Sequence, residues 1–451
     1  MTLQDERPGG MSEQEYADNL RRATLASSIG SALEYYDFAL YGLAAALIFG
    51  KLFFPALGPN AALIASFATL AVGFLARPIG GLVFGVLGDK IGRKWVLMVT
   101  IALMGGASTL IGVLPTADQL GSWGWVAPAL LILMRLAQGL GAGAEQAGAT
   151  VLMAEYSPRK RRGFFSALPF VGIMLGTLLA SVVFWLITLA PEDVLLGWLW
   201  RVPFLVSILL ILVAVFIRSR LKETPAYVEL EKSEQVSESP MRELFTNPTS
   251  RRNVLVGIGL RMAENGGSYI YNNLAVSYMV LMGVQKSWGP IAVAAAAIVG
   301  CFTIPLTGHL SDRYGRKPVY RAGAAILALV AFPSWYLFSL GNPILGVVMI
   351  ALAIGLGVNG MLGPQCAMLP ELFGAQHRYI GVAVSREFSA ILAGGLGPFL
   401  GAWLLQVTNN AWWPVATFVF ALALITLYST FVAPETAGRD ITKIEDAHHD
   451  E

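Results

Sequence analysis

The sequence has few charged residues for its length. Of 451 residues, only 13% are Asp, Glu, Lys or Arg, while 55% are hydrophobic. Soluble domains carry roughly 25% charged residues. This composition excludes a soluble enzyme with a large core and is typical of a protein that crosses a membrane several times. The net charge is only +2, so no overall field favours nucleic acid as a partner.

Cysteines are also scarce, and several chemical motifs are missing. The two cysteines, Cys301 and Cys366, lie inside apolar segments, so neither a disulfide framework nor a thiolate metal site is expected. The first 22 residues are polar and lack the apolar core of a signal peptide. No glycine-rich nucleotide loop and no spacing of metal ligands occurs. We therefore expect no enzymatic activity and no metal.

Long apolar runs are what the sequence has in abundance. Twelve of them reach the roughly 20 residues that a helix needs to cross a bilayer. They lie at about 24–50, 61–87, 95–115, 125–153, 163–190, 197–218, 253–283, 288–310, 318–340, 342–369, 379–408 and 411–433. We predict an all-α membrane protein with twelve transmembrane helices.

Two short hydrophilic turns indicate a tandem repeat. The turn Gly88–Lys94 and the turn Ser311–Lys317 share an Asp-x-x-Gly-Arg-Lys core, and each follows the second apolar segment of its half. The charged residues repeated between them include Asp89 and Arg93 in the first turn and Asp312 and Arg316 in the second. Such repetition is expected of a transporter built from two related halves.

A second pair of charges is repeated in the same order. Glu155 precedes Arg162 by seven residues, and Glu371 precedes Arg378 by the same spacing. Both pairs follow the fourth apolar segment of their half, so we predict two pseudo-symmetric six-helix halves. The predicted domains are an N-terminal tail at 1–22, the first half at 23–218, a linker at 219–252, the second half at 253–433 and a C-terminal tail at 434–451.

The distribution of Lys and Arg predicts the orientation in the membrane. With the N-terminus inside, the outer loops hold little beyond Lys51, Arg201 and Lys286. The positive-inside rule then places both termini in the cytoplasm, in a multi-pass protein of the cytoplasmic (inner) membrane embedded in the lipid bilayer. Small-xxx-small pairs occur at Gly139/Gly143 and Gly172/Gly176. They predict close packing within one chain, and we expect a monomer.

Ionisable residues inside the predicted spans indicate a polar pathway. Such residues are costly in a bilayer and usually face a cavity or one another. Stripes occur in segments 1, 4 and 7: Glu34, Asp37 and Tyr41; Arg135, Gln138 and Glu145; Arg261, Glu264, Asn265, Ser268 and Asn272. Segment 11 adds Arg386 and Glu387, and segment 2 adds Arg77, for which we expect a structural role beside the repeated turn. Internal ion pairs would explain any one of these residues, but stripes in three corresponding segments favour a shared pathway.

Carboxylates and arginines have separate expected roles. Because the four histidines lie near helix ends, in a loop or in the tail, a proton would be carried by a carboxylate: Asp37 first, then Glu34, Glu145 and Glu264. A guanidinium group binds a carboxylate through two parallel hydrogen bonds. The predicted substrate-binding residues are Arg135 and Arg261, with Tyr41, Gln138, Asn265, Asn272 and Arg386.

The repeated turns are expected to close the cytoplasmic side. Free N–H groups and the dipole at a helix N-terminus attract carboxylates. Segments 5 and 11 begin on that side, so we expect Asp312 at the start of segment 5 and Asp89 at the start of segment 11. The predicted conformational latch comprises Asp89, Arg93, Asp312, Arg316, Glu155, Arg162, Glu371 and Arg378.

The two turns resemble the signature loop of the major facilitator superfamily. The resemblance to this superfamily extends over about residues 24–435. Within it, the chain resembles the metabolite:proton symporter family. The stretches that carry this likeness are Glu34–Phe38 with Tyr41–Gly42, Arg77–Gly81, Trp200–Phe204, and Gly363–Gln365 with Glu371–Phe373, Arg378–Tyr379 and Gly394–Gly395. Gln365 thereby joins the predicted substrate-binding residues. Relatives usually have an aromatic residue after the glutamate of segment 4, whereas this chain has Gln146.

The resemblance implies a twelve-helix fold, alternating access and proton-coupled uptake. We expect a symporter for a small organic acid, a shikimate- or dicarboxylate-like metabolite, with the proton as coupling ion and no cofactor. A zwitterionic osmolyte such as proline or betaine is the alternative substrate. A membrane substrate sensor on a transporter fold is the alternative outside transport.

Overall fold

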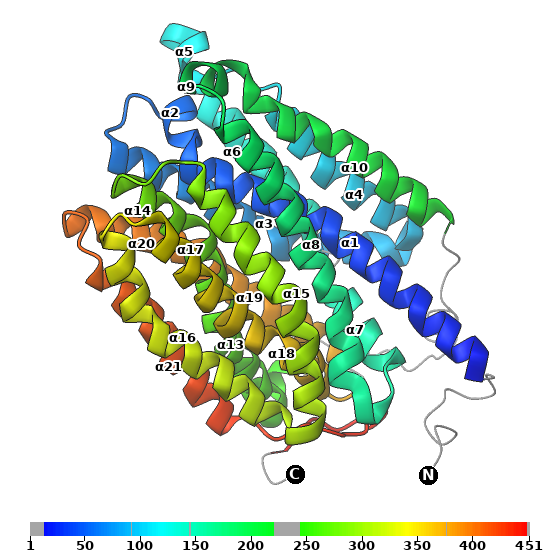
Figure 1. Ribbon diagram of the computed structural model, residues 1–451. Coiled ribbons are helices and arrows are strands. Elements are labelled where there is room, and N and C mark those ends of the chain that lie inside the picture. The colour runs from blue at the N-terminus through cyan, green and yellow to red at the C-terminus, as the bar shows by residue number, and fades with distance from the viewer. Residues whose placement is uncertain (1–12, 92, 144–145, 221–243, 376, 449–451) are drawn as a thin grey trace.

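The computed structural model describes residues 13–91, 93–143, 146–220, 244–375 and 377–448. These residues form helices joined by short turns, and no strand occurs among them (Figure 1). Each of the twelve predicted segments coincides with one long helix or with a run of consecutive helices. Residues 221–243, most of the predicted linker, lie outside the described residues.

The first half contains six long elements. They are α1 (Glu13–Leu47), α3 (Pro59–Ile91), α4 (Arg93–Ile111), α6 (Val126–Ala142) continued by α7 (Gln146–Tyr156), α8 (Arg162–Thr188) and α10 (Arg201–Arg220). Short helices connect them at the ends: α2 (Phe49–Phe53), α5 (Ala117–Leu120), η2 (Gly121–Trp123), η3 (Arg159–Arg161), α9 (Glu192–Val194) and η4 (Leu195–Leu199).

The second half also has six long elements, three of which contain π-helical turns. They are α13 (Pro248–Tyr269) with η5 (Ile270–Ala275) and α14 (Val276–Leu281), α15 (Trp288–Tyr314), α16 (Arg316–Ser339), α17 (Pro343–Ile350) with η6 (Ala351–Val358) and α18 (Asn359–Glu371), α19 (Arg378–Ser389) with η7 (Ala390–Gly395) and α20 (Leu396–Val407), and α21 (Trp413–Val432). Asn247 caps α13 by accepting the N–H of Thr249, and Asn342 caps α17 by accepting those of Ile344 and Leu345.

Length and apolarity identify most of these elements as membrane spans. Among the described residues, seven helices are long and apolar enough to cross a membrane, or up to nine if each of two bent pairs is one span. Three further elements complete the twelve. Of these, α1 and α13 carry the charged stripes, and α4 contributes a shorter apolar stretch, Met98–Ile111.

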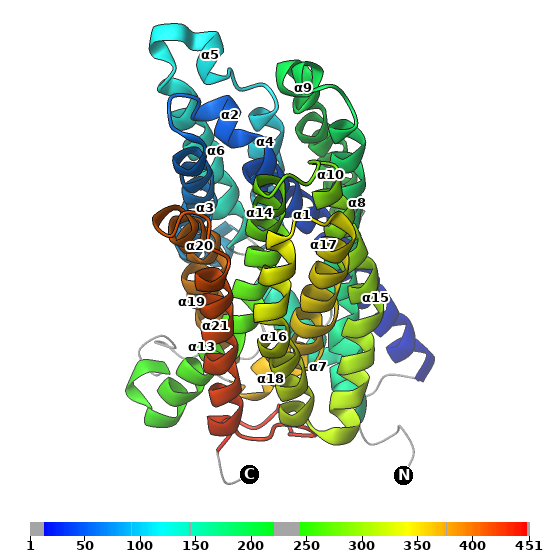
Figure 2. The same ribbon diagram turned by 60° about the vertical axis from the view of Figure 1, so that its left-hand side comes forward.

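The helices run along one common direction, so the connections gather at two ends. Figure 2 shows α2, α5 and α9 at one end, and the start of α1 and the end of α21 at the opposite end. The two halves meet along two seams, where α8 packs against α15 and where α3 packs against η7 and α20. Residues from both seams therefore border the space between the halves.

Glycines let several helix pairs approach to backbone contact. A Cβ on Gly172 or Gly176 of α8 would overlap the carbonyl oxygen of Ser28 or Ala32 on α1. At the C-terminal cap of α6, a Cβ on Gly143 would overlap the carbonyl oxygen of Arg77 on α3. The small-residue pairs are thus used for packing within the chain, as expected.

Substituting one of these glycines should destabilise the protein. Gly176→Ala forces α8 away from α1, and overpacking of this kind costs about 1–3 kcal/mol. Gly106→Ala is the matched control, because no atom lies within 4 Å of its Cβ position in α4. The control should be neutral or slightly stabilising, since Ala favours helix over Gly by about 0.5–1 kcal/mol. Thermal unfolding in detergent measures both, and an unchanged midpoint for Gly176→Ala would contradict the packing.

Candidate functional site

A small cavity of about 10 Å³, with room for about one water molecule, lies between the two halves. Its polar lining consists of Arg77 on α3, Arg261 and Asn265 on α13, and Arg386 and Glu387 on α19. Its aromatic lining consists of Tyr35, Phe74 and Tyr269. Phe74 and Tyr269 come from different halves and pack edge to face with ring centroids 4.9 Å apart. The cavity is therefore walled by guanidinium groups and aromatic rings.

A buried ion pair joins the halves at this cavity. Arg77 donates from Nε to Oε2 of Glu387 at 3.0 Å and from Nη2 to Oε1 at 3.3 Å. Only 3% of Arg77 and 8% of Glu387 is exposed. The guanidinium group also lies 5.5 Å from the ring centre of Phe38 and 5.7 Å from that of Phe74. This two-point geometry is the strong form of an arginine–carboxylate contact.

Arg261 lies on the second-half side of the same cavity. Its Nη2 lies 3.3 Å from Oε2 of Glu264, and its Nε donates to Ser389 Oγ at 3.0 Å. Asn265 donates to the same hydroxyl at 3.1 Å. Within the described part of the chain, Nη1 of Arg261 is buried without a hydrogen-bond partner. That nitrogen is available to a ligand in the cavity.

A separate hydrogen-bond network lies in the first half beside the cavity. Arg135 is 1% exposed, stacks 4.2 Å from the ring centre of Tyr41 and donates from Nη1 to Gln138 Oε1 at 3.0 Å. Gln138 in turn donates to Ser108 Oγ at 2.7 Å. Among the described residues, Nε and Nη2 of Arg135 have no hydrogen-bond partner. The guanidinium charge is thus held mainly by an aromatic face and an amide.

Asp37 belongs to the same region of the first half. It is 7% exposed and accepts a hydrogen bond of 2.7 Å from Ser207 Oγ on α10. The described residues place no cation within ion-pair distance of it. A buried carboxylate held by a hydroxyl rather than by an arginine is well suited to take up a proton.

The structure divides the predicted substrate-binding residues into groups. Arg261, Asn265 and Arg386 line the cavity, whereas Tyr41, Arg135 and Gln138 form the neighbouring network. Two others bond within the second half: Gln365 accepts from Tyr320 at 2.8 Å, and Asn272 donates to Ser268 at 3.4 Å. Among the predicted proton carriers, Glu34 is buried, Glu264 pairs with Arg261, and Glu145 lies outside the described residues.

Sequence reasoning missed part of the cavity. Arg77 was expected to have a structural role beside the repeated turn, but it lines the cavity with Glu387. Twelve residues of helix separate Arg77 from Asp89, which is about 18 Å at 1.5 Å per residue. That length alone indicates a position deep in the membrane. The aromatic lining residues gave no comparable signal, because apolar rings also occur throughout the core.

At the end where α1 begins and α21 finishes, the repeated charges pair reciprocally between the halves. Glu155 accepts from Arg378 Nη1 at 2.8 Å, and Glu371 accepts from Arg162 Nη1 at 3.0 Å. Each arginine also donates from Nε to the carbonyl eight residues earlier, Ala154 for Arg162 and Pro370 for Arg378. The equivalent residues of the two halves thus exchange partners.

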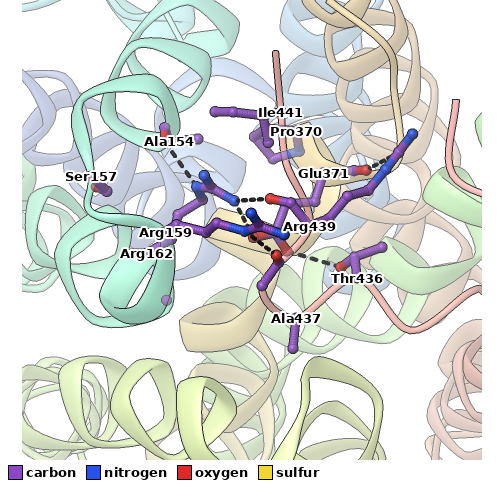
Figure 3. A network of polar contacts seen from close by, with 12 residues as sticks. Ala154, Ser157, Arg159, Arg162, Pro370, Glu371, Thr436, Ala437, Arg439 and Ile441 are labelled. Carbon is purple, nitrogen blue, oxygen red and sulfur yellow. Dashed lines mark hydrogen bonds and ion pairs between the residues drawn. The ribbon is translucent and has the colours of Figure 1, made fainter. Parts of the chain in front are cut away.

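Glu371 is the centre of a wider network at this end. It is fully buried and accepts from both Arg316 Nε and Nη2 at 3.1 Å and from Thr436 Oγ1 at 2.9 Å. Figure 3 shows Arg162, Glu371, Thr436 and Arg439 converging here. Arg439 donates to the Glu371 carbonyl at 2.6 Å, and its own carbonyl accepts from Arg162 at 2.8 Å. The segment after α21 therefore joins the contact between the halves.

Asp312 binds the start of segment 5, as expected. Its two carboxylate oxygens accept the N–H groups of Gly163 at 2.7 Å and Phe164 at 2.9 Å in the first turn of α8. It also pairs with Arg316 at 2.7 Å. The corresponding expectation for Asp89 and Arg93 falls on side chains outside the described residues.

The opposite end has its own contacts between the halves. Glu192 bridges Lys51 of the first half at 2.6 Å and Lys286 of the second half at 2.8 Å. Hydrogen bonds from Lys286 and Lys51 lower the pKa of Glu192 from its usual value of 4.5 to about 2. Its depressed pKa means that the bridge is complete above about pH 4.5 and is lost as pH falls through about 2. Near neutral pH it is a constant contact.

Comparisons with known proteins agree with this architecture. The Major Facilitator Superfamily model matches residues 27–385 and 285–449. The chain is 35% identical over 425 residues to the shikimate transporter of Escherichia coli K12, covering 92% of this chain and 95% of the relative. It is 35% identical over 434 residues to the proline/betaine transporter of the same strain, covering 94% of this chain and 85% of the relative.

One solved structure shows the same fold. The proton:xylose symporter XylE from E. coli, bound to 6-bromo-6-deoxy-D-glucose, aligns with a TM-score of 0.73. The alignment covers 95% of this chain and 98% of that chain at 17% identity. At this identity the likeness concerns the fold and not the ligand.

Removing one contact at each end should shift the conformational equilibrium in opposite directions. Asp312→Asn weakens the hold on α8 and should favour the state open at the start of α1, lowering transport with near-normal expression. Glu192→Gln should favour opening at the other end. Thiol labelling of Ser277→Cys reports opening at the end that Glu192 holds. Ser277 is buried there and donates a hydrogen bond to the Ala46 carbonyl, so a thiol at this position reacts only when that end opens.

We expect labelling at position 277 to slow in Asp312→Asn and to quicken in Glu192→Gln, in a background without Cys301 and Cys366. The exposed neighbour Asp193→Asn is the matched control and should leave the rate unchanged. Equal labelling in both variants, or full transport by Asp312→Asn, would show that these contacts do not control the two ends.

Proposed function

Because this chain belongs to the major facilitator superfamily, we propose that it imports a small organic acid across the cytoplasmic membrane together with a proton. Like its relatives, it is a multi-pass membrane transporter and not an enzyme. Those relatives are a shikimate transporter and a proline/betaine transporter, and the solved structure of the same fold is a proton:xylose symporter. The choice among substrates is argued from the cavity.

The charge of the cavity lining carries the proposal. Three guanidinium groups, Arg77, Arg261 and Arg386, line it, against one carboxylate, Glu387. Two further buried carboxylates lie beside the lining: Glu264 contacts Arg261 from its own helix, and Glu34 on α1 lies near Arg77. Protonation of one of them would leave the guanidinium groups in excess. Arginine forks bind carboxylates through two hydrogen bonds, and a site with an excess of them favours an anion. A cationic substrate would be repelled.

A zwitterionic osmolyte is the second candidate, favoured by the aromatic rings. Tyr35, Phe74 and Tyr269 line the cavity, and aromatic faces bind quaternary ammonium groups. Arg77 already lies over the ring of Phe74, and Phe74 contacts Tyr269 edge to face. Part of this aromatic surface is therefore occupied by the protein's own cation, which favours the organic acid.

Asp37 is the proposed proton carrier. It is buried on α1 and accepts a hydrogen bond from the hydroxyl of Ser207. Arg135 lies in the same half and is joined to Ser108 through Gln138. Protonation of Asp37 removes a negative charge near the pathway, so a proton and an anion would enter together. Glu34, Glu145 and Glu264 are the other candidates.

The basic residues at one end support the proposed orientation. Arg159, Arg162, Arg316 and Arg378 all lie at the end where α1 begins and α21 finishes. Cations concentrate on the cytoplasmic side of membrane proteins. Both termini would therefore be cytoplasmic. We further propose that the carrier works as a monomer and needs no cofactor besides the proton.

A ligand panel tests the substrate class. Organic acids such as shikimate, α-ketoglutarate and citrate should raise the melting temperature of the purified protein, because a ligand that binds the folded state stabilises it. Arg261→Lys and Arg135→Lys keep the charge and remove the fork, so uptake of the acid should fall about tenfold or more. Arg321→Lys is the control, because Arg321 binds Thr430 away from the cavity. Stabilisation by betaine or proline alone would replace the acid with a zwitterion.

Replacing the proposed proton carrier should separate accumulation from exchange. Asp37→Asn holds the site in a neutral form, so uphill uptake driven by a pH gradient should be lost while exchange of substrate persists. Uptake and counterflow in proteoliposomes measure the two activities. The exposed carboxylate Asp118 provides the control variant Asp118→Asn. Persistent pH-driven accumulation in both Asp37→Asn and Glu34→Gln would place the proton elsewhere.

A further inference from the structure

The ion pair between Arg77 and Glu387 has properties that a purely structural contact does not need. Both partners line the cavity, so the pair faces the space where a ligand would lie. The guanidinium group offers Nε and Nη2, and the carboxylate takes both with two hydrogen bonds. An organic anion would use this same two-point geometry. Glu387 therefore occupies the position on the guanidinium group of Arg77 that a substrate carboxylate would bind.

From this geometry we propose that Glu387 is a specificity-determining residue that the carboxylate of the substrate displaces from Arg77. The proposal rests on the organic-acid function proposed above and deepens it. In the empty carrier, Glu387 binds Arg77; in the loaded carrier, the substrate does. Two other guanidinium groups, those of Arg261 and Arg386, line the same cavity and provide the displaced carboxylate with an alternative cation.

Such an exchange would select substrates by charge. Breaking a buried ion pair is strongly unfavourable when it leaves one charge without a counter-ion. A neutral ligand would break the two-point contact with Arg77 without replacing its anion, whereas a carboxylate replaces one anion by another. The cavity thus discriminates against uncharged molecules of similar size through the cost of losing the two-point contact on Arg77.

The same exchange would link binding to movement of the halves. Arg77 belongs to α3 in the first half and Glu387 to α19 in the second, and they meet where α3 packs closely against η7. A Cβ on Gly395 of η7 would lie 3.0 Å from Phe74 on α3. Displacement of Glu387 removes an ion pair across this seam at the level of the cavity. The halves could then separate at either end without the Arg77–Glu387 ion pair holding them together at the level of the cavity.

Binding measurements on three variants test the proposal. In Glu387→Gln the competing anion is gone, so the affinity for the acid that stabilises the wild type should rise about tenfold. In Arg77→Gln the receptor is gone, and the affinity should fall by a similar factor. The double variant Arg77→Gln/Glu387→Gln should resemble Arg77→Gln. The methyl ester of the same acid is the matched ligand control and should gain nothing from Glu387→Gln.

A structural ion pair gives a different pattern. Both single variants would then lower the melting temperature of the empty protein without moving the affinity in opposite directions. An unchanged or weaker affinity in Glu387→Gln, with normal binding by the wild type, overturns this inference and leaves the organic-acid function intact. A wild type that binds none of the acids overturns that function itself.

A second variant covers the case in which Glu387→Gln does not fold. Glu387→Asp keeps the charge but shortens the side chain, so the two-point contact with Arg77 is weakened and the acid should bind more tightly than to the wild type. An affinity in Glu387→Asp equal to that of the wild type would also overturn the inference.

Discussion

A guanidinium group inside a membrane needs a counter-charge or hydrogen-bond acceptors, and this requirement organises the protein. Arg77 meets it with Glu387 across the seam between the halves, and Arg261 meets it with Glu264 on its own helix. Arg135 instead lies against the ring of Tyr41 and one amide. Because different groups compensate each guanidinium charge, the arginines differ in how readily they bind an incoming anion.

The contacts between the halves occur at three levels with different chemistry. At one end, buried arginines and glutamates exchange partners between equivalent positions, as Arg162 does with Glu371. At the other end, the exposed Lys51 and the partly buried Lys286 meet Glu192. The pair in between is buried and borders the cavity. A carrier that alternates its access has to open one end at a time, and distinct contacts at the two ends allow each to be broken separately.

The two halves share a fold but divide the chemistry. The first half holds Asp37 and a network of hydroxyl and amide groups, which suits a group that changes its protonation. The second half contributes Arg261, Arg386 and Glu387 to the cavity beside Arg77 of the first half, and these groups suit an anion. The π-helical turns η5 and η7 occur in the second half next to this site, and such turns are frequent at functional sites.

The sequence by itself determined the spans, the repeat and the contact of Asp312 with α8. A bilayer demands long apolar helices, and a carboxylate in a short turn has few places to bind except the nearest helix N-terminus. It also pointed to Arg261, Asn265 and Arg386. Only the tertiary structure decided that Arg77 meets Glu387, because 310 residues separate them and the pairing depends on how α3 and α19 are rotated about their axes. Periodicity identifies one face of a helix, whereas the partner of that face depends on how the whole bundle packs.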